Sequence, residues 1–169
     1  MDQKLKINGD RFLVDLEALR EFGKQGAGVI RPAFSPADID SRRWLAEKFE
    51  DCGLTPRWDR AANLFGMPPQ PGKPILIGSH SDTQPQGGWL DGAYGVVLAL
   101  EVARTCQEVG GPPVAVVSFQ DEESAFMPLT GSCFFSGKLS RDALCDLTNA
   151  AGQRYGDLAS ALSELEESE

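Results

Sequence analysis

The spacing of apolar residues along the chain predicts alternating helices and strands. Between Asp10 and Gly23 apolar residues recur every three or four positions, which is typical of an amphipathic helix. Ser35 can cap a second helix, which is expected to end at Gly53. The stretch between them, residues 26–34, is expected to be a loop.

Short apolar runs in the middle of the chain predict strands. Residues 54–59 and 63–67 favour two strands, and the run PPQPGKP after them forms a turn. Residues 74–78 are an uninterrupted apolar run, typical of a strand that is buried on both faces. A helix from near Asp91 separates it from another apolar strand at 114–119. This order predicts a right-handed crossover between parallel strands.

Two more helices are expected at 131–139 and 157–165, with a polar loop between them. No repeat, low-complexity tract or linker interrupts the sequence, so residues 1–169 are expected to form one domain. The predicted fold class is α/β, with a mostly parallel sheet flanked by helices.

Charge and composition exclude several classes of function. The 16 basic and 25 acidic residues give a formal net charge of -9, which repels nucleic acid and anionic membrane surfaces. The N-terminal run MDQKLKINGDRF contains no apolar signal segment, and no stretch has the roughly 18 apolar residues of a membrane helix. A cytoplasmic protein with no nucleic-acid or membrane partner is expected. Its four cysteines form no CxxC pair and are expected to be reduced, mostly buried thiols.

A histidine and an aspartate follow the first apolar strand, in the run GSHSD at 78–82. Ligands of open α/β sheets bind at the carboxyl ends of strands. His80 and Asp82 are two residues apart, so on extended backbone their side chains point to the same side. The pair suits a metal-binding imidazole that is oriented by a carboxylate. A strand-end histidine that only hydrogen-bonds a nearby acid is the alternative.

Asp91 follows a glycine-rich loop, in the run GGWLDGAYG, at the expected start of a helix. It could be the N-cap of that helix. A carboxylate also has enough lone pairs to bridge two cations, and Gly92 and Gly95 would let the backbone approach closely. Capping and metal binding are compatible roles for Asp91.

Three consecutive acids, Asp121, Glu122 and Glu123, follow the second apolar strand. They repel one another unless a cation or a shared proton compensates, and an exposed acidic turn is the alternative. Near a metal, one glutamate could act as general base while its neighbour binds the ion. Because the crossover makes the two strands neighbours, all three groups of residues are expected to converge on one site, as in a two-metal hydrolase.

Five runs along the chain, two of which contain these residues, resemble the hydantoinase/carbamoylase family of two-zinc amidohydrolases. They are RPAFSPADIDSRRWL, GLTPRWDRAANLFG, PILIGSHSDTQPQGGWLDGAYGVVLALEV, VVSFQDEES and LTGSCFFSGKL. The family includes N-carbamoyl-L-amino-acid hydrolases, β-ureidopropionases and allantoate amidohydrolases. The resemblance extends from about Asp10 to Leu162 and corresponds to the N-terminal part of the family's catalytic domain. The run TQPQGG points to this family over related peptidases.

The resemblance implies a role for each motif residue. His80, Asp91 and Glu123 would bind metal, with Asp91 bridging two ions, and Asp82 would orient His80. Glu122 would be the general base in the hydrolysis of a linear carbamoyl or ureido C–N bond. The resemblance implies zinc as the divalent metal, with manganese as the alternative, and a small ureido or carbamoyl compound as the substrate.

Two differences from the family are visible. The family usually has an arginine before Phe126, where this chain has Ser124 and Ala125. The family also takes histidine ligands from later in the sequence and forms homodimers through an inserted domain, whereas this chain has one histidine and neither the dimerisation domain nor the C-terminal catalytic segment. The chain is therefore expected to be inactive by itself, as a fragment, split gene product or degenerate copy of an amidohydrolase. A non-catalytic binding module of the same fold, and a peptidase or acyl-amino-acid deacylase relative, are the alternatives.

Overall fold

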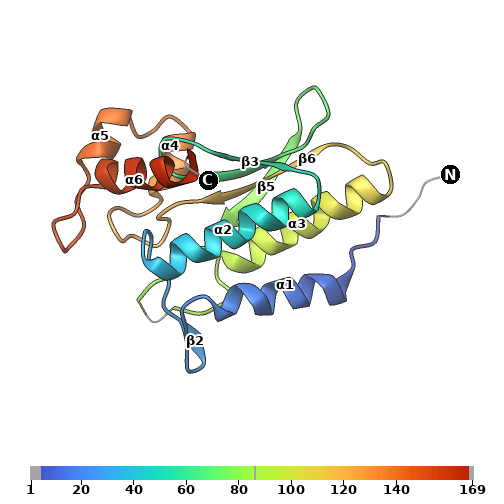
Figure 1. The fold of residues 1–169 in the computed structure, drawn as a ribbon, viewed down its shortest axis with the longest axis horizontal. Helices are drawn as coiled ribbons and strands as arrows, with labels where there is room; N and C mark the ends of the chain where they lie inside the picture. Colours follow the sequence, from blue (N-terminus) through green and yellow to red (C-terminus); the bar gives the residue numbers. More distant parts are fainter. Residues whose placement is uncertain (1–4, 86, 168–169) are drawn as a thin grey trace.

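A four-stranded mixed sheet lies at the centre of the computed structural model, which describes residues 5–85 and 87–167 (Figure 1). The sheet has the strand order β3-β4-β6-β5, and β1 and β2 form a separate two-stranded sheet. The α/β class, with a sheet flanked by helices, is confirmed. In chain order the elements are α1 (Gly9–Glu21), β1 (Lys24–Gln25), β2 (Gly28–Val29), α2 (Pro36–Asp51), β3 (Thr55–Trp58), β4 (Leu64–Met67), β5 (Ile75–His80), α3 (Ala93–Glu108), β6 (Val114–Phe119), α4 (Thr130–Phe135), α5 (Arg141–Asp146) and α6 (Tyr155–Glu167).

The central sheet pairs its strands in both directions. β5 and β6 are parallel, in register from Ile75 opposite Val114 to His80 opposite Phe119, as a crossover through α3 requires. β3 pairs with β4, and β4 with β6, in the antiparallel direction, so this sheet is mixed rather than mostly parallel. β3 and β4 are antiparallel because the short connection at 59–63 is too short for a crossover.

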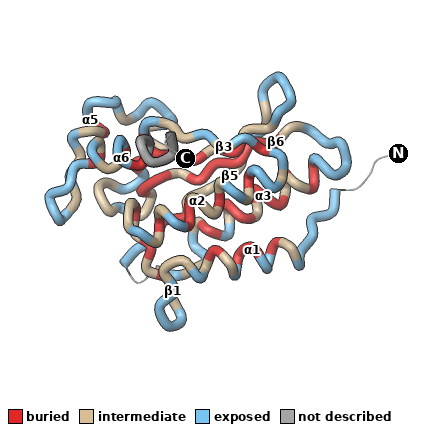
Figure 2. The backbone as a smooth tube through the Cα atoms, in the orientation of Figure 1, coloured by how far each residue is buried: buried red, intermediate tan, exposed pale blue. Residues whose placement is uncertain are grey.

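Helices α2 and α3 pack on one face of the sheet, and α1 lies against α3 (Figure 1). The buried segments in Figure 2 follow β6 and the inward sides of these helices. Gly66 in β4 lets α2 sit close to the sheet, because a Cβ there would lie 2.8 Å from the ring of Phe49. A smaller apolar cluster around Tyr155 joins α5 and α6 to the turn that contains Ala61 and Ala62.

The expected cap of the second helix is present, whereas two expected loops contain regular structure. The hydroxyl of Ser35 accepts a hydrogen bond from the amide of Asp38 at 3.2 Å and caps α2. Part of the expected loop at 26–34 belongs to the short β1–β2 pair, and α5 lies within the expected polar loop. α4 ends at Phe135, earlier than expected, and Gly137 after it takes a left-handed φ of 75° that stops the helix.

The burial of β5 differs from the prediction. The apolar run was expected to be buried on both faces, but Ile75 is 53% exposed and Leu76 is 39% exposed. Of Ile75, Leu76 and Ile77, only Ile77 packs against the main core. β5 is the last strand of the sheet, so one of its edges has no strand beside it among the described residues. The expectation was wrong because the apolar run does not reveal whether a neighbouring strand is present.

Two further expectations concern membranes and thiols. In the described ranges no helix combines the length and the apolar character that crossing a membrane would require.

The four cysteines are unpaired, but only Cys106 is buried; Cys52, Cys133 and Cys145 are half-buried, so the thiols are less buried than expected. Burial raises the pKa of the Cys52 thiol, although the charge of Arg104 opposes this.

Candidate metal centre

Three segments of the fold meet at the carboxyl end of the parallel strand pair. β5 ends at His80, the chain then passes Asp91 into α3, and β6 is followed closely by Glu122 and Glu123. His80, Asp91 and Glu123 each offer one ligand atom, and these atoms all lie within 4.8 Å of one another. The structure therefore brings together the three residues to which the sequence assigned metal binding.

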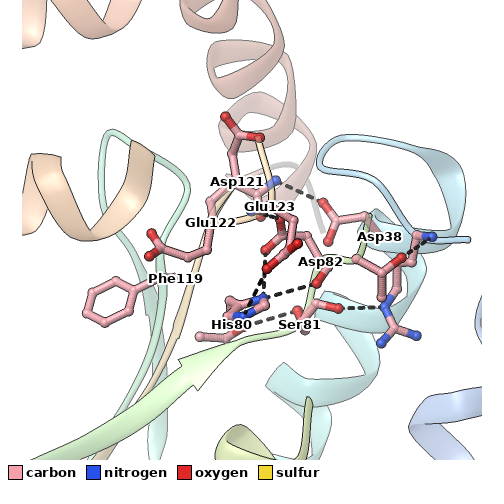
Figure 3. A network of polar contacts seen from close by, with 12 residues as sticks. Asp38, His80, Ser81, Asp82, Phe119, Asp121, Glu122 and Glu123 are labelled. Atoms are coloured by element: carbon pink, nitrogen blue, oxygen red, sulfur yellow. Dashed lines mark hydrogen bonds and ion pairs between the residues drawn. The ribbon is translucent and has the colours of Figure 1, made fainter. Parts of the chain in front are cut away.

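His80 contacts Asp82 on one side and faces Glu123 on the other (Figure 3). Its Nδ1 lies 3.0 Å from the backbone oxygen of Asp82 and 3.4 Å from Oδ1 of the same residue. Its Nε2 lies 3.8 Å from Oε1 of Glu123. Burial lowers the pKa of His80, but hydrogen bonding to Asp82 and the charges of Asp82 and Glu123 raise it above its ordinary value. With Nδ1 against the backbone oxygen of Asp82, the imidazole turns Nε2 toward the cluster, an orientation that a backbone carbonyl or a carboxylate gives to histidine ligands of metals.

The start of α3 approaches His80 because Gly92 has no side chain. Gly92 takes a left-handed φ of 64°, and a Cβ there would lie 2.4 Å from Cε1 of the imidazole. Gly95 acts similarly one turn later, since its Cβ would lie 2.7 Å from Cβ of Ser79. Gly92 is the N-cap of α3 and no side chain caps this helix, so capping does not use the carboxylate of Asp91.

Asp121 is directed into its own loop rather than toward the cluster. Its carboxylate accepts hydrogen bonds from the backbone amides of residues 125–127 and from the hydroxyl of Thr130. Burial raises the pKa of Asp121 to about 6, although these donors oppose the shift. This arrangement separates Asp121 from Glu122 and Glu123 and fixes the loop that carries them.

The carboxylate of Glu122 lies away from the cluster (Figure 3). One of its oxygens accepts a hydrogen bond from the amide of Ser132 at 2.8 Å, and the other accepts one from the Ser132 hydroxyl at 2.7 Å. The structure therefore does not place Glu122 among the ligand atoms. To act on a water at the cluster, its side chain has to rotate away from Ser132.

Arg31 supports the site, and the sequence analysis did not single it out. It is fully buried and donates from Nε to the backbone oxygen of Ser81 at 2.8 Å. Its backbone pairs with Thr83 through two hydrogen bonds. Burial lowers the pKa of Arg31 to about 10, while the charges of Asp38 and Asp82 oppose this. Arg31 thus holds the backbone on both sides of Asp82. In the sequence, the signal that could have identified Arg31 is its position as the only charged residue in the otherwise uncharged run VIRPAF.

Known proteins are similar to most of this chain. The model of peptidase family M28 matches residues 63–150, which is more than half of the chain and includes His80, Asp91 and Glu123. The crystal structure of an amidase of the hydantoinase/carbamoylase family from Burkholderia phymatum matches with a TM-score of 0.89 and 43% identity, over 96% of this chain and 41% of the amidase. The chain belongs to peptidase family M28 and to the hydantoinase/carbamoylase family.

Two curated relatives have named activities. The N-carbamoyl-L-amino-acid amidohydrolase of Rhizobium meliloti is 33% identical over 90% of this chain and 39% of its own length. The allantoate amidohydrolase of Bacillus subtilis (strain 168) is 31% identical over 76% of this chain and 33% of its own length. The chain therefore spans less than half the length of these two relatives and of the amidase.

Two features of the sequence were expected to bear on family membership, the run TQPQGG and the residues before Phe126. In the run TQPQGG, Gln86 lies outside the described residues. Ser124, where the family pattern differs, is exposed and takes a left-handed φ of 73°. The neighbouring amides of residues 125–127 are held by Asp121, so this loop has a defined shape despite the altered sequence.

Proposed function

We propose that the chain is the metal-binding part of an amidohydrolase that cleaves a linear carbamoyl or ureido C–N bond. The observation that carries the proposal is the cluster of His80, Asp91 and Glu123, in a chain whose relatives are named N-carbamoyl-L-amino-acid and allantoate amidohydrolases. The proposed substrates are an N-carbamoyl amino acid, a β-ureido acid or allantoate.

The residues of the cluster fit a divalent cation. One imidazole and two carboxylates are ligands that both zinc and manganese accept. Zinc–oxygen and zinc–nitrogen bonds are about 2.0–2.2 Å long, so such ligands of one ion lie within about 4.4 Å of one another. The observed spread of up to 4.8 Å is close to this limit. Divalent metal held by His80, Asp91 and Glu123 would supply an activated water and stabilise the negative charge that develops on the substrate oxygen.

Residues of the chain orient the ligands and move the proton. Asp82 holds the Nδ1 side of His80, which directs Nε2 toward the cluster. Glu122 is the general base that takes the proton from the attacking water. Its carboxylate first leaves the amide and hydroxyl of Ser132, which hold it in the observed conformation. Release of Glu122 from Ser132 is therefore one step in forming the active site.

The 169 residues by themselves are proposed to be inactive. A catalytic zinc site needs about three protein ligands and a water, so three ligands shared between two ions leave each ion short of partners. The chain has no histidine other than His80 to add. The second candidate function is a non-catalytic binding module of the same fold, and the contact of Glu122 with Ser132 is the observation that favours it.

The test compares the chain alone with a fusion in which Glu169 is followed by the sequence that comes after the matched region in the Burkholderia phymatum amidase. In calorimetric titration with zinc or manganese, the chain alone should bind at most one ion, and weakly. It should release no ammonia from N-carbamoyl amino acids, N-carbamoyl-β-alanine or allantoate. The fusion should release ammonia from one of these compounds, and Glu122→Gln should abolish the release without loss of metal.

Two outcomes would contradict the proposal. Robust ammonia release or two tightly bound ions in the chain alone would show that the short form is a complete enzyme. A fusion that binds two ions and hydrolyses none of the substrates would favour the non-catalytic module instead.

A further inference from the structure

Asp91 reaches the metal cluster at the end of the loop that joins β5 to α3. Of this loop the structure describes residues 81–85 and 87–92. Asp91 is exposed, and no side chain caps α3, the helix that begins after it. The position of its carboxylate therefore depends on the contacts that hold the loop.

Backbone contacts hold the first part of this loop against the segment between α1 and α2. The amide of Thr83 donates to the backbone oxygen of Arg31 at 2.9 Å, and the amide of Val29 donates to that of Gly87 at 3.3 Å. Gly28 permits the second contact, because a Cβ there would lie 2.9 Å from the backbone oxygen of Gly87. Figure 1 shows the described parts of the loop beside β2 and the end of α1. These contacts fix the loop at two points, but neither point is next to the ligand residue.

Trp89 holds the part of the loop that is nearest to Asp91. Its half-buried side chain packs against the main core, and the guanidinium of Arg20 lies over its ring, 4.7 Å from the centroid. A cation over the face of an aromatic ring is attracted electrostatically, and tryptophan is the most favourable ring for this contact. Trp89 is therefore held both by the core and by Arg20, which lies in the last turn of α1.

The stacking on Trp89 is the contact that directs Arg20 toward the loop. The side chain of Arg20 is only 22% exposed. Its ion pair with Glu17, at 3.4 Å, joins two positions of the same helix at the surface, where such pairs contribute little. Within the part of the chain that the structure describes, its buried Nε has no hydrogen-bond partner. The contact that carries the guanidinium from α1 across to the loop is thus the indole of Trp89.

The backbone connects Trp89 to the cluster over a short stretch. Leu90 alone lies between Trp89 and Asp91, and its backbone oxygen accepts a hydrogen bond from the amide of Tyr94 at 3.0 Å. The backbone oxygen of Asp91 accepts one from the amide of Ala93 at 2.6 Å. Asp91 is thus attached to the start of α3 on one side and to Trp89 on the other, so a displacement of the indole shifts its carboxylate.

We propose that Arg20 is a positioning residue for Asp91 and that it acts through Trp89. The ligand atoms of the cluster lie within 4.8 Å of one another, close to the limit of about 4.4 Å for ligands of one zinc ion. A shift of about 1 Å is enough to impair such a site. Arg20 therefore keeps Asp91 within reach of the ion that His80 and Glu123 would share with it. This role rests on the proposed binding of metal by Asp91.

Calorimetric titration of the chain with zinc provides the first test. Arg20→Met removes the cation and should lower the zinc affinity about two- to fivefold, the factor that a cation–π contact supplies. Arg20→Lys keeps a cation over the ring and should retain most of the affinity. Lys48→Met is the matched control, because Nζ of Lys48 lies over Trp44, 5.5 Å from the ring centroid, and Trp44 packs against the same core. Equal affinities of Arg20→Met and Lys48→Met would overturn the proposal.

A double-mutant cycle tests whether Arg20 acts through Trp89. Trp89→Leu should lower the zinc affinity roughly tenfold or more, whereas Trp44→Leu should leave it unchanged, although each removes a half-buried indole from the same core. When Trp89→Leu is already present, Arg20→Met should cause little further loss, because the ring on which the cation acts is gone. Losses that add in the double variant would mean that Arg20 acts on the cluster by another route, and the proposal would be wrong.

Hydrogen exchange without metal separates a failure of this role from a failure of the proposed function. The amide of Tyr94, whose acceptor is Leu90, should exchange about two- to fivefold faster in Arg20→Met than in the unmodified chain, and at an unchanged rate in Lys48→Met. If this amide responds as expected while the unmodified chain binds no zinc, Arg20 still positions Asp91 and the proposed function is wrong. Unchanged exchange in Arg20→Met would contradict the positioning role, whatever the zinc affinity.

Discussion

The backbone amide of Glu123 donates a hydrogen bond to Oδ2 of Asp82 at 3.0 Å, so one carboxylate links the loop after β5 to the loop after β6. The other oxygen of Asp82 lies 3.4 Å from Nδ1 of His80. Asp82 is only 1% exposed, which shields both contacts from bulk water. The backbone oxygen of Asp82 also lies 3.0 Å from Nδ1 of His80, so Asp82 contacts the proposed imidazole ligand through main chain and side chain and binds the backbone of the proposed carboxylate ligand.

The first prediction follows from this link. Asp82→Asn should weaken zinc binding by the chain about tenfold to 100-fold, because a neutral amide cannot support the imidazole as a carboxylate does. The measurement is calorimetric titration of each purified protein with zinc. Asp40→Asn, which removes an exposed acid from α2, is the control and should leave the affinity unchanged. An unchanged affinity in Asp82→Asn would show that the carboxylate does not tune His80.

The two adjacent glutamates should respond differently to the same chemical change. Glu123→Gln should lower the zinc affinity roughly tenfold or more, because Oε1 of Glu123 lies in the cluster, 3.8 Å from Nε2 of His80. Glu122→Gln should leave the affinity nearly unchanged, because the carboxylate of Glu122 is bound to Ser132. Each variant is the control for the other in the same titration. Reversed phenotypes would mean that the roles of the pair are exchanged.

The parts of the fold that depend on local signals could be predicted from the sequence. The apolar runs at β5 and β6, with a helix between them, were enough to predict the parallel crossover. Because parallel strands share their carboxyl end, the crossover also explains why His80 and Glu123 meet although they are far apart in the sequence. The capping of α2 by Ser35 likewise depends only on residues close by in the sequence, and it was predicted.

Features that depend on distant partners could not be predicted in the same way. The burial of Leu76 is decided by what lies beside and over β5, which the apolar run does not specify. Glu122 and Glu123 are chemically identical, and only the positions of Ser132 and His80 determine where each carboxylate lies. The role of Arg31 arises from backbone oxygens that the fold brings to it.

A buried acid behind the site should make stability depend on pH. Burial raises the pKa of Asp38 above its ordinary value, although the charge of Arg42 opposes this. The folded protein therefore keeps this proton to a higher pH than the unfolded chain does, so the contribution of Asp38 to stability is greatest below the unfolded pKa and falls as pH rises through the folded pKa. In the Asp38→Asn variant the side chain is an amide, which neither gains nor loses a proton in this pH range.

The Asp38→Asn variant should therefore gain stability relative to the unmodified chain as pH rises above about 4, the ordinary pKa of an aspartate. The measurement is the difference in unfolding free energy between the two proteins, from urea titrations at increasing pH. The sign of the difference at any one pH does not matter, because the amide also changes the hydrogen bonds to Phe34 and Gln120. A difference that stays constant with pH would show that Asp38 has the same pKa in the folded and unfolded states.

The last prediction concerns the close approach of α3 to His80. A Cβ on Gly92 would lie within 2.5 Å of Cε1, Nδ1 and Nε2 of the imidazole, so Gly92→Ala forces the ring or the start of α3 to move. The displaced ring can no longer present Nε2 to Asp91 and Glu123 as it does now. Zinc affinity should fall roughly tenfold or more, as measured by calorimetric titration.

Gly110 provides a matched control for the backbone. It takes a left-handed φ of 66°, close to the 64° of Gly92, but a Cβ there would meet no atom within 4 Å. Both Gly92→Ala and Gly110→Ala should therefore lose about 1 kcal/mol of stability or more from the strained backbone, whereas only Gly92→Ala should lose zinc affinity. Because the strain is shared, any difference in zinc binding between the two variants reports the contact with His80. Equal zinc affinities would show that the imidazole position observed here is not the one that binds metal.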